Sequence, residues 1–196
     1  MPTAILNPNA PSPLDTGMWN ITGAATAWEA LSDNSASTFV FYVAPDDHVA
    51  VLFDSLPIDA FEIVSVDLHA AIGQEAGGTN LSAIGLWGEF SGQEWSSSFT
   101  PSDGSRSIVS CAFPVDPNGN PWDVGLVNTT SGAIVNASGG LATICEKMWL
   151  EVVYTVATVT TTKALTGNAL IAAAVAGTIH ATAVKVCGSA PVQSLR

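Results

Sequence analysis

Two glutamates that lie close to tryptophans are the side chains best suited to hydrolytic chemistry in this sequence. Glu89 follows Trp87 and Glu94 precedes Trp95, with a short polar stretch between the two acids. Glycoside hydrolases use two carboxyl groups held at a fixed separation. A glutamate at the edge of a hairpin is usually a solvated surface residue, however. We therefore expect that the protein is not an enzyme, and keep hydrolysis by this pair as a third hypothesis.

The three histidines predict no metal site, because their spacing matches no zinc motif. His48, His69 and His180 lie in separate segments, and no H-x-H, H-E-x-x-H or H-x-x-x-H pattern occurs. The sequence also has no G-x-S-x-G motif and no phosphate-binding loop. We expect each histidine to be structural or on the surface, and we expect no cofactor.

The segment DPNGNPWD contains side-chain oxygens that could bind calcium. They belong to Asp116, Asn118, Asn120 and Asp123. The segment lacks the glycine at the sixth position and the closing glutamate of an EF-hand loop. Clustered Asp, Asn and Pro residues are typical of tight turns. The favoured interpretation is a turn, and calcium binding is the alternative.

Two of the six tryptophans, Trp95 and Trp122, lie in or beside polar loops. An exposed indole can stack on a sugar ring, because it combines an apolar face with an N–H donor. Loop tryptophans are also frequent anchors of protein interfaces. For Trp95 and Trp122 we favour a place in an interface or in the core, with glycan binding as the alternative.

The three cysteines are Cys111, Cys145 and Cys187, an odd number that fits no zinc motif. We expect buried thiols that pack as small hydrophobic side chains. One disulfide, within a chain or between chains, is the alternative.

Short apolar segments that end at turn residues predict an all-β chain. The clearest alternation lies at 61–73, where Glu62, Val64, Val66, Leu68 and Ala70 share the face expected to form the core. A short helical turn is an option in TAWEALSD (26–33), and a bulge is an option in the long strand at 141–156. The other predicted strands span 38–44, 48–56, 81–90, 107–115, 122–129 and 132–138, with a short one near 95–100. This number of strands, without a long amphipathic helix, indicates a two-sheet antiparallel sandwich of jelly-roll type.

The composition excludes several classes of partner. The net charge is −12 and the five basic residues are not clustered, so direct binding of nucleic acid or of anionic lipid is not expected. Charged residues make up only 11% of the chain, which indicates that subunit contacts hide part of the surface. The N-terminal residues have no basic region and no apolar stretch of adequate length, so no signal peptide is predicted.

The C-terminal segment 158–196 is rich in Gly and Ala, and its side chains are small on both faces. Its longest apolar run, 169–177, is well short of the roughly 20 residues that span a membrane. Its alternation fits short strands slightly better than a helix. Such a segment is stabilised when another backbone approaches closely, so we predict an arm for assembly; folding back on its own domain is the alternative. The residues of the arm that we expect to make assembly contacts are Leu170, Ile171, Val175 and Ile179.

The order of several segments is also informative. The chain contains, in this order, the segments MWNITGAATAWEALSD, TFVFYVAP, VLFDSLPIDAFEIVSVDLHAAIG and PWDVGLVNTTSGAIVNASGGLATICEKMWLEVVYTV. The Gly/Ala-rich end follows them. This layout, over about residues 14–157, resembles β-sandwich virion proteins of tailed bacteriophages, of the head decoration, head-fibre and minor capsid types. The resemblance implies a structural role in a capsid or tail, usually as a homo-oligomer and often as a trimer. It carries over no catalytic residue.

The expected organisation has three parts: an N-terminal Pro-rich arm (1–17), a β-sandwich domain (18–157) and a C-terminal assembly arm (158–196). The favoured function is a non-enzymatic phage virion structural protein that contacts its own copies and major capsid or other virion proteins. Its expected location is the virion. The alternative is a carbohydrate-binding module whose loop tryptophans attach to glycans of the host surface.

Overall fold

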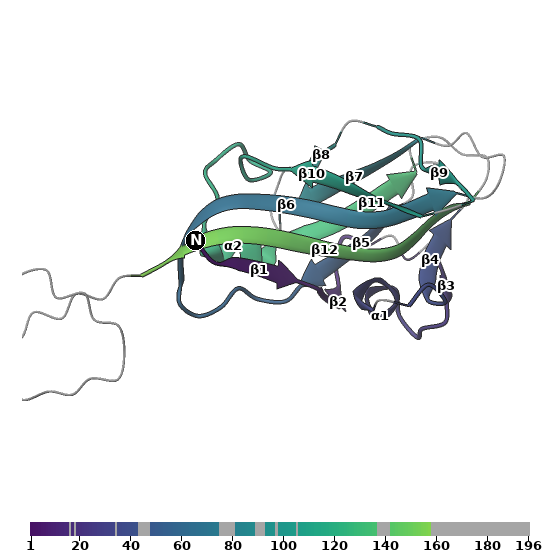
Figure 1. The fold of residues 1–196 in the computed structure, drawn as a ribbon, viewed down its shortest axis with the longest axis horizontal. Coiled ribbons are helices and arrows are strands. Elements are labelled where there is room, and N and C mark those ends of the chain that lie inside the picture. The colour runs from purple at the N-terminus through teal and green to yellow at the C-terminus, as the bar shows by residue number, and fades with distance from the viewer. Residues whose placement is uncertain are drawn as a thin grey trace, which may run out of the picture. The chain divides into compact units, whose positions relative to one another are not determined.

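Two antiparallel β-sheets stacked face to face form the described part of the chain (Figure 1). The computed structural model describes residues 1–15, 17, 19–33, 35–42, 48–74, 81–88, 93–96, 98–104, 106–136 and 142–157. The chain divides into two units, Met1–Ala157 and Thr158–Arg196, and all described residues lie in the first.

The first sheet has seven strands and the second has five. In the first sheet the strand order is β10 (Ser107–Ala112), β6 (Ala60–Gln74), β12 (Thr143–Val156), β4 (Phe39–Tyr42) and β3 (Asn20–Thr22). In addition, β1 (Thr3–Leu6) pairs with β12, and β9 (Ser102–Asp103) runs parallel to β6. In the second sheet the order is β2 (Pro8–Pro11), β5 (His48–Phe53), β11 (Ser131–Asn136), β7 (Ser82–Trp87) and β8 (Gln93–Trp95). The two described helices are α1 (Ala27–Ser32) and α2 (Val124–Thr129), and neither is long and apolar enough to cross a membrane.

Eight of the described strands follow the jelly-roll arrangement. The chain passes from β4 to β5, β6 and β7, changing sheet at each step, and then through β8, β10, β11 and β12. The resulting orders, β10-β6-β12-β4 and β5-β11-β7-β8, are those of two interleaved Greek keys. The predicted two-sheet antiparallel sandwich is confirmed.

The longest strand pair, β6 and β12, carries the alternation read from the sequence. Val66, Leu68 and Ala70 are buried against the second sheet, whereas Glu62 and Val64 near the start of β6 are exposed. On β12 the buried partners are Met148, Leu150, Val152 and Tyr154. Each fully buried aliphatic side chain of this kind contributes roughly 1.5–3 kcal/mol. The register of β12 shifts between Cys145 and Lys147, so the optional bulge is present.

Helix α1 is a single capped turn, as the sequence allows at 26–33. The Thr26 hydroxyl accepts a hydrogen bond from the Glu29 N–H at 3.3 Å, and the Glu29 carboxylate accepts one from the Thr26 N–H at 3.0 Å. This reciprocal capping box satisfies two backbone donors that the helix would otherwise leave open. Ala30 and Leu31 are fully buried, which anchors α1 on the sandwich.

The prediction of a strand at 122–129 is wrong, because residues 124–129 form helix α2. The Asp123 carboxylate accepts a hydrogen bond from the Leu126 N–H at 2.8 Å and so caps the first turn. The apolar residues of VGLVNT resemble a strand locally, but only Val127 among them is buried. The cap therefore overrides the β propensity of this segment.

The structure places the N-terminal segment 1–17 differently from the predicted arm. Its strand β1 pairs with β12 from Thr3 to Leu6, and its strand β2 pairs with β5. Leu6 is buried in the core. The prolines of β2 are tolerated because β2 is an edge strand, where one row of N–H groups has no ladder partner. This segment is part of the sandwich of its own chain.

Candidate functional site

Several residues singled out from the sequence lie outside the described part of the chain. Glu89, His180 and Cys187 are among them, and so are all four apolar residues of the C-terminal arm: Leu170, Ile171, Val175 and Ile179. The backbone of Glu94 and Trp95 belongs to β8, but their side chains are outside the described part as well. The carboxylate pair, the arm and the exposure of Trp95 therefore stay predictions.

Trp122 belongs to the core. Its side chain is only 9% exposed, and its indole N–H donates a hydrogen bond of 2.8 Å to the Phe113 carbonyl oxygen. Phe113 is itself buried. Trp122 is therefore a core residue in the described part of the chain, and its indole is not an exposed surface.

The DPNGNPWD segment contains a turn that is stabilised by hydrogen bonds to the Asp116 carboxylate. The Asp116 Oδ1 atom accepts hydrogen bonds from the N–H groups of Asn118 at 2.9 Å and Asn120 at 2.7 Å. Desolvation of this carboxyl would raise its pKa, but these hydrogen bonds favour the charged form and leave the pKa of Asp116 below its ordinary value. Asp123 is occupied in capping α2. No cluster of three or more His, Cys, Asp or Glu residues with metal-binding geometry occurs among the described residues.

Two of the cysteines are described, and both are free thiols. Cys145 is fully buried, and this burial raises the pKa of its thiol to about 12. A thiol with this pKa is protonated at neutral pH and is a poor nucleophile. Cys145 therefore packs as a small hydrophobic side chain, as expected.

His48 has a structural role. Its Nε2–H donates a hydrogen bond of 2.8 Å to the Leu14 carbonyl oxygen, and its ring meets the Trp87 indole edge-on at 4.2 Å between centroids. These contacts join the segment before Thr16 to the second sheet.

His69 lies at the centre of a row of polar and aromatic side chains on the outer face of the seven-stranded sheet. In the strand register it is directly opposite Ser110 of β10 on one side and Trp149 of β12 on the other. Its Nδ1 atom is 2.7 Å from the Ser110 hydroxyl, and its ring stacks on the Trp149 indole with 5.0 Å between centroids and 7° between planes. We refer to Ser110, His69 and Trp149 as the central row.

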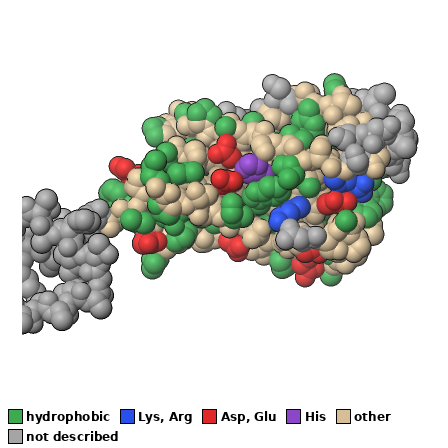
Figure 2. All heavy atoms as spheres, in the orientation of Figure 1, with side chains coloured by type: hydrophobic (Ala, Val, Ile, Leu, Met, Phe, Trp, Pro, Cys, Tyr) green, Lys and Arg blue, Asp and Glu red, His purple; other side chains and the backbone are tan. Residues whose placement is uncertain are grey.

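Charged side chains of both signs flank the central row. The Glu151 carboxylate lies 3.6 Å from the His69 Nε2 atom, and Asp67 is the cross-strand partner of Glu151. The Lys147 ammonium lies 5.2 Å from the centre of the Trp149 ring. Figure 2, which views the molecule from the side of β6 and β12, shows acidic, basic and histidine side chains gathered among hydrophobic ones on this face. The face thus combines an aromatic ring with hydrogen-bond donors and acceptors.

Ser110, His69 and Glu151 are the residue types of a hydrolytic triad, but β6 and β10 do not surround them with backbone donors. Acyl transfer needs backbone or side-chain donors aimed at the developing oxyanion. The N–H groups of β6 and β10 lie in the plane of the sheet and not above its face. A group bound over Ser110 would meet no such donors from these strands.

The sequence contains one weak signal for this face. His69 falls on the set of 61–73 that alternates away from the core, and Trp149 and Glu151 fall on the equivalent set of 141–156. The alternation in 61–73 predicts one wetter side, and His69, Trp149 and Glu151 are partly exposed in the structure. That they meet in one row depends on the pairing of β6 with β12, which local patterns do not specify.

A search with protein-family models and a search of curated protein sequences found no match to this chain. Solved structures with a similar fold include the CBM22-1 xylan-binding domain of Paenibacillus barcinonensis Xyn10C, at 8% identity and a TM-score of 0.42 over 78% of this chain and 94% of that one. The Stig cyclase Fisc from Fischerella sp. TAU has 10% identity and a TM-score of 0.40, covering 78% of this chain and 85% of that one. TmCBM61 in complex with β-1,4-galactotriose has 10% identity and a TM-score of 0.37, covering 76% and 87%.

Similarity at this level assigns neither a ligand nor an activity to this chain. The resemblance to phage structural proteins stays a prediction.

Proposed function

We propose that this β-sandwich is a non-catalytic binding module that holds a neutral carbohydrate on the outer face of its seven-stranded sheet. The observation that carries the proposal is the position of Trp149, in the middle of a sheet face between His69, Lys147 and Glu151. A sugar presents an apolar ring face and a rim of hydroxyl groups. An indole surrounded by donors and acceptors is complementary to both features.

The aromatic part of the site is fixed before a ligand arrives. Trp149 and His69 are cross-strand neighbours in the longest strand pair, and their parallel stacking holds the indole upright on the sheet. Stacking on His69 occupies one face of the indole, and the Lys147 ammonium lies over the ring 5.2 Å from its centre, so the lysine side chain has to move when a sugar stacks there. A side chain already held in its binding conformation loses little entropy on binding, which improves affinity.

The polar part of the site supplies both kinds of hydrogen bond. The Ser110 hydroxyl can donate or accept, the Glu151 and Asp67 carboxylates accept, and the Lys147 ammonium donates. Glu151 is 41% exposed, so its oxygens are accessible to sugar hydroxyls.

The charge of the protein favours a neutral glycan over an acidic one. The net charge is −12, and the two described basic side chains are Arg106 and Lys147. Arg106 forms an ion pair of 2.9 Å with Glu146. A uronic or sulfated sugar would meet repulsion from the whole protein with Lys147 as the nearest counter-charge.

Binding of neutral oligosaccharides, found on a glycan array and quantified by calorimetry, tests the proposal. Trp149→Ala should weaken binding about tenfold or more, because it removes the stacking surface. His69→Ala should weaken binding less, since it removes only the support of the indole. Phe61→Ala is the matched control: Phe61 is an exposed aromatic residue on the same strand as His69, outside the central row, and its loss should leave binding unchanged.

Two results would refute this function. One is an oligosaccharide that binds Trp149→Ala as tightly as the unaltered protein. The other is an array on which no neutral glycan binds. A place on a phage particle and self-assembly stay predictions from the sequence, and attachment to a host-surface glycan is compatible with both.

A further inference from the structure

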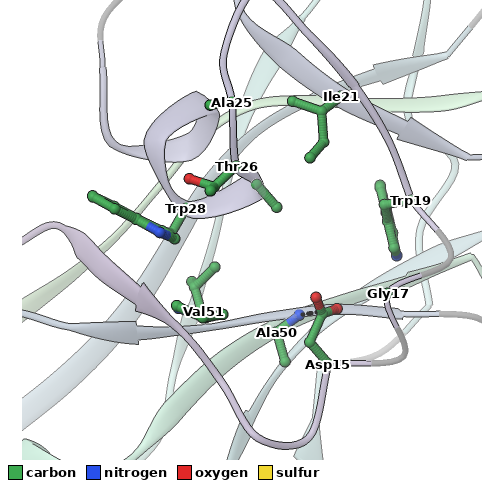
Figure 3. Close-up of a pocket in the computed structure, with 11 residues that line it drawn as sticks. Asp15, Gly17, Trp19, Ile21, Ala25, Thr26, Trp28, Ala50 and Val51 are labelled. Atoms are coloured by element: carbon green, nitrogen blue, oxygen red, sulfur yellow. Dashed lines mark hydrogen bonds between the residues drawn. The ribbon is translucent and has the colours of Figure 1, made fainter.

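A pocket lies at one side of the sandwich, away from the central row. It is a pocket of about 230 Å³ beside α1, where the edge strand β3 of one sheet approaches β2 and β5 of the other. Its walls come from the end of β2, the segment that leads into β3, the start of α1 and the middle of β5 (Figure 3). The lining is Pro11, Asp15, Gly17, Trp19, Ile21, Ala25, Thr26, Ala27, Trp28, Ala50 and Val51.

Two indoles form opposite walls of this pocket. Figure 3 shows Trp19 and Trp28 on either side of the space, both nearly edge-on to the viewer, with a ring face of Trp19 turned toward it. Trp19 is 8% exposed and therefore fixed by packing. Trp28 is held by the capped first turn of α1. The position of both rings is thus set by secondary structure.

A carboxylate forms part of the floor. The Asp15 side chain accepts a hydrogen bond of 3.3 Å from the Ala50 N–H, and Figure 3 shows it directed toward the space between the indoles. Asp15 is the only charged residue among the described residues of the lining, and neither Arg106 nor Lys147 contributes to it. The pocket therefore has negative potential within a protein of net charge −12.

The remaining lining is apolar and offers few hydrogen-bond acceptors. Ile21, Val51 and Pro11 contribute only carbon surface from their side chains. The Thr26 hydroxyl is committed to Glu29, to whose carboxylate it donates at 2.9 Å and from whose N–H it accepts at 3.3 Å. A primary ammonium group would bring three N–H donors that this lining satisfies poorly, at a cost in affinity.

We propose that this pocket binds a quaternary or highly methylated ammonium group. Such a group is positively charged, has no N–H donors to satisfy and presents methyl groups to apolar walls. Its charge is attracted to the ring face of Trp19 and to the Asp15 carboxylate, and its methyl groups can pack against Trp28. A trimethylammonium head group is small enough for a pocket of about 230 Å³. The site is independent of the proposed carbohydrate face, with which it shares no residue.

Titration of the full-length protein with choline tests this proposal, followed by calorimetry and by tryptophan fluorescence. The comparison ligand is 3,3-dimethylbutan-1-ol, which has the shape of choline without its charge. Choline should bind at least tenfold more tightly than this alcohol, and more tightly than ethanolamine, which carries a primary ammonium group. Asp15→Asn keeps an oxygen for the Ala50 N–H but removes the charge, and it should weaken choline binding about fivefold or more.

Matched variants separate this site from folding and from the carbohydrate face. Trp28→Ala should abolish choline binding, and Trp28→Phe, which keeps an aromatic wall, should retain part of it if the fold is intact by circular dichroism. Trp149→Ala should bind choline like the unaltered protein. The proposal is overturned if choline and the alcohol bind equally, if Asp15→Asn has no effect, or if choline does not saturate the protein.

Discussion

Several side chains whose chemistry suits a ligand site instead stabilise the local structure of this protein. Asp116 and Asp123, which have calcium-ligand chemistry, both accept hydrogen bonds from backbone N–H groups. Trp122, in a polar stretch, donates its N–H to a carbonyl in the core. Asp, Asn and Trp in a turn satisfy nearby backbone groups readily, so their presence alone is weak support for a ligand site.

Replacement of Asp116 by Ala tests its role in the turn. The side chain is 1% exposed, and its loss leaves the N–H groups of Asn118 and Asn120 without their partner. We expect a loss of about 1–3 kcal/mol in the free energy of unfolding at pH 7, measured by urea denaturation. Asp54→Ala, at an exposed position, is the control and should change stability by less than about 0.5 kcal/mol.

The effect of Asp116 should also depend on pH. Its pKa in the folded protein is lower than its ordinary value of 3.8, so the unfolded chain takes up the proton first as pH falls. The stabilisation is complete above the unfolded-state pKa and is lost as pH falls through the lowered folded-state pKa. The difference in stability between the unaltered protein and Asp116→Ala should therefore shrink in acid. A difference that grows as pH falls below about 4 would contradict this assignment.

At the level of strands and helices, the position of a segment in the fold determines its secondary structure more than its local propensity does. The alternation in β6 and β12 survives because both strands are central and have one face in the core. In α2 a β-like sequence becomes a helix, because Asp123 caps it and the segment connects the two sheets. The prolines of β2 fit a strand only because that strand is at an edge.

Gly132 of β11 lies against core side chains that leave no room for a Cβ atom. A Cβ atom there would lie 2.5 Å from Phe53 Cζ and 3.1 Å from Met148 Sδ. We expect Gly132→Ala to destabilise the protein by about 1–3 kcal/mol in thermal or urea unfolding, because both neighbours are packed in the core. Adding Phe53→Leu should recover part of this loss, so that the double variant is less destabilised than the sum of the single ones. Strict additivity would show that the Phe53 ring is not the cause.

The whole Met1–Ala157 unit has the parts of a self-sufficient sandwich. Its jelly roll closes with β12, which ends at Val156, and the N-terminal strands complete both sheets. Most buried side chains of the two sheets and α1 form one core cluster, and Ala50, Trp87 and Ala133 form a second, smaller one.

Deletion of residues 158–196 should leave the sandwich folded. We expect the far-ultraviolet circular dichroism of Met1–Ala157 to stay β-rich and its midpoint of thermal unfolding to change by only a few degrees, since the core is retained. If the deleted segment is an arm for assembly, as the sequence predicts, the mass in solution should fall to that of fewer subunits. Outright unfolding of the truncated protein would mean that the segment belongs to the core.

The fold class of this protein follows from its sequence, because alternation of period two and turn residues are local features that survive in any sandwich. The buried faces of β6 and β12 and the turn at Asp116 follow in the same way. The two candidate sites do not. His69 and Trp149 meet only through the register of two strands far apart in the chain, and Trp19, Trp28 and Asp15 surround a pocket only because edge strands of both sheets converge beside α1. Register and convergence result from the packing of the whole core, and for that reason no short stretch of sequence specifies them.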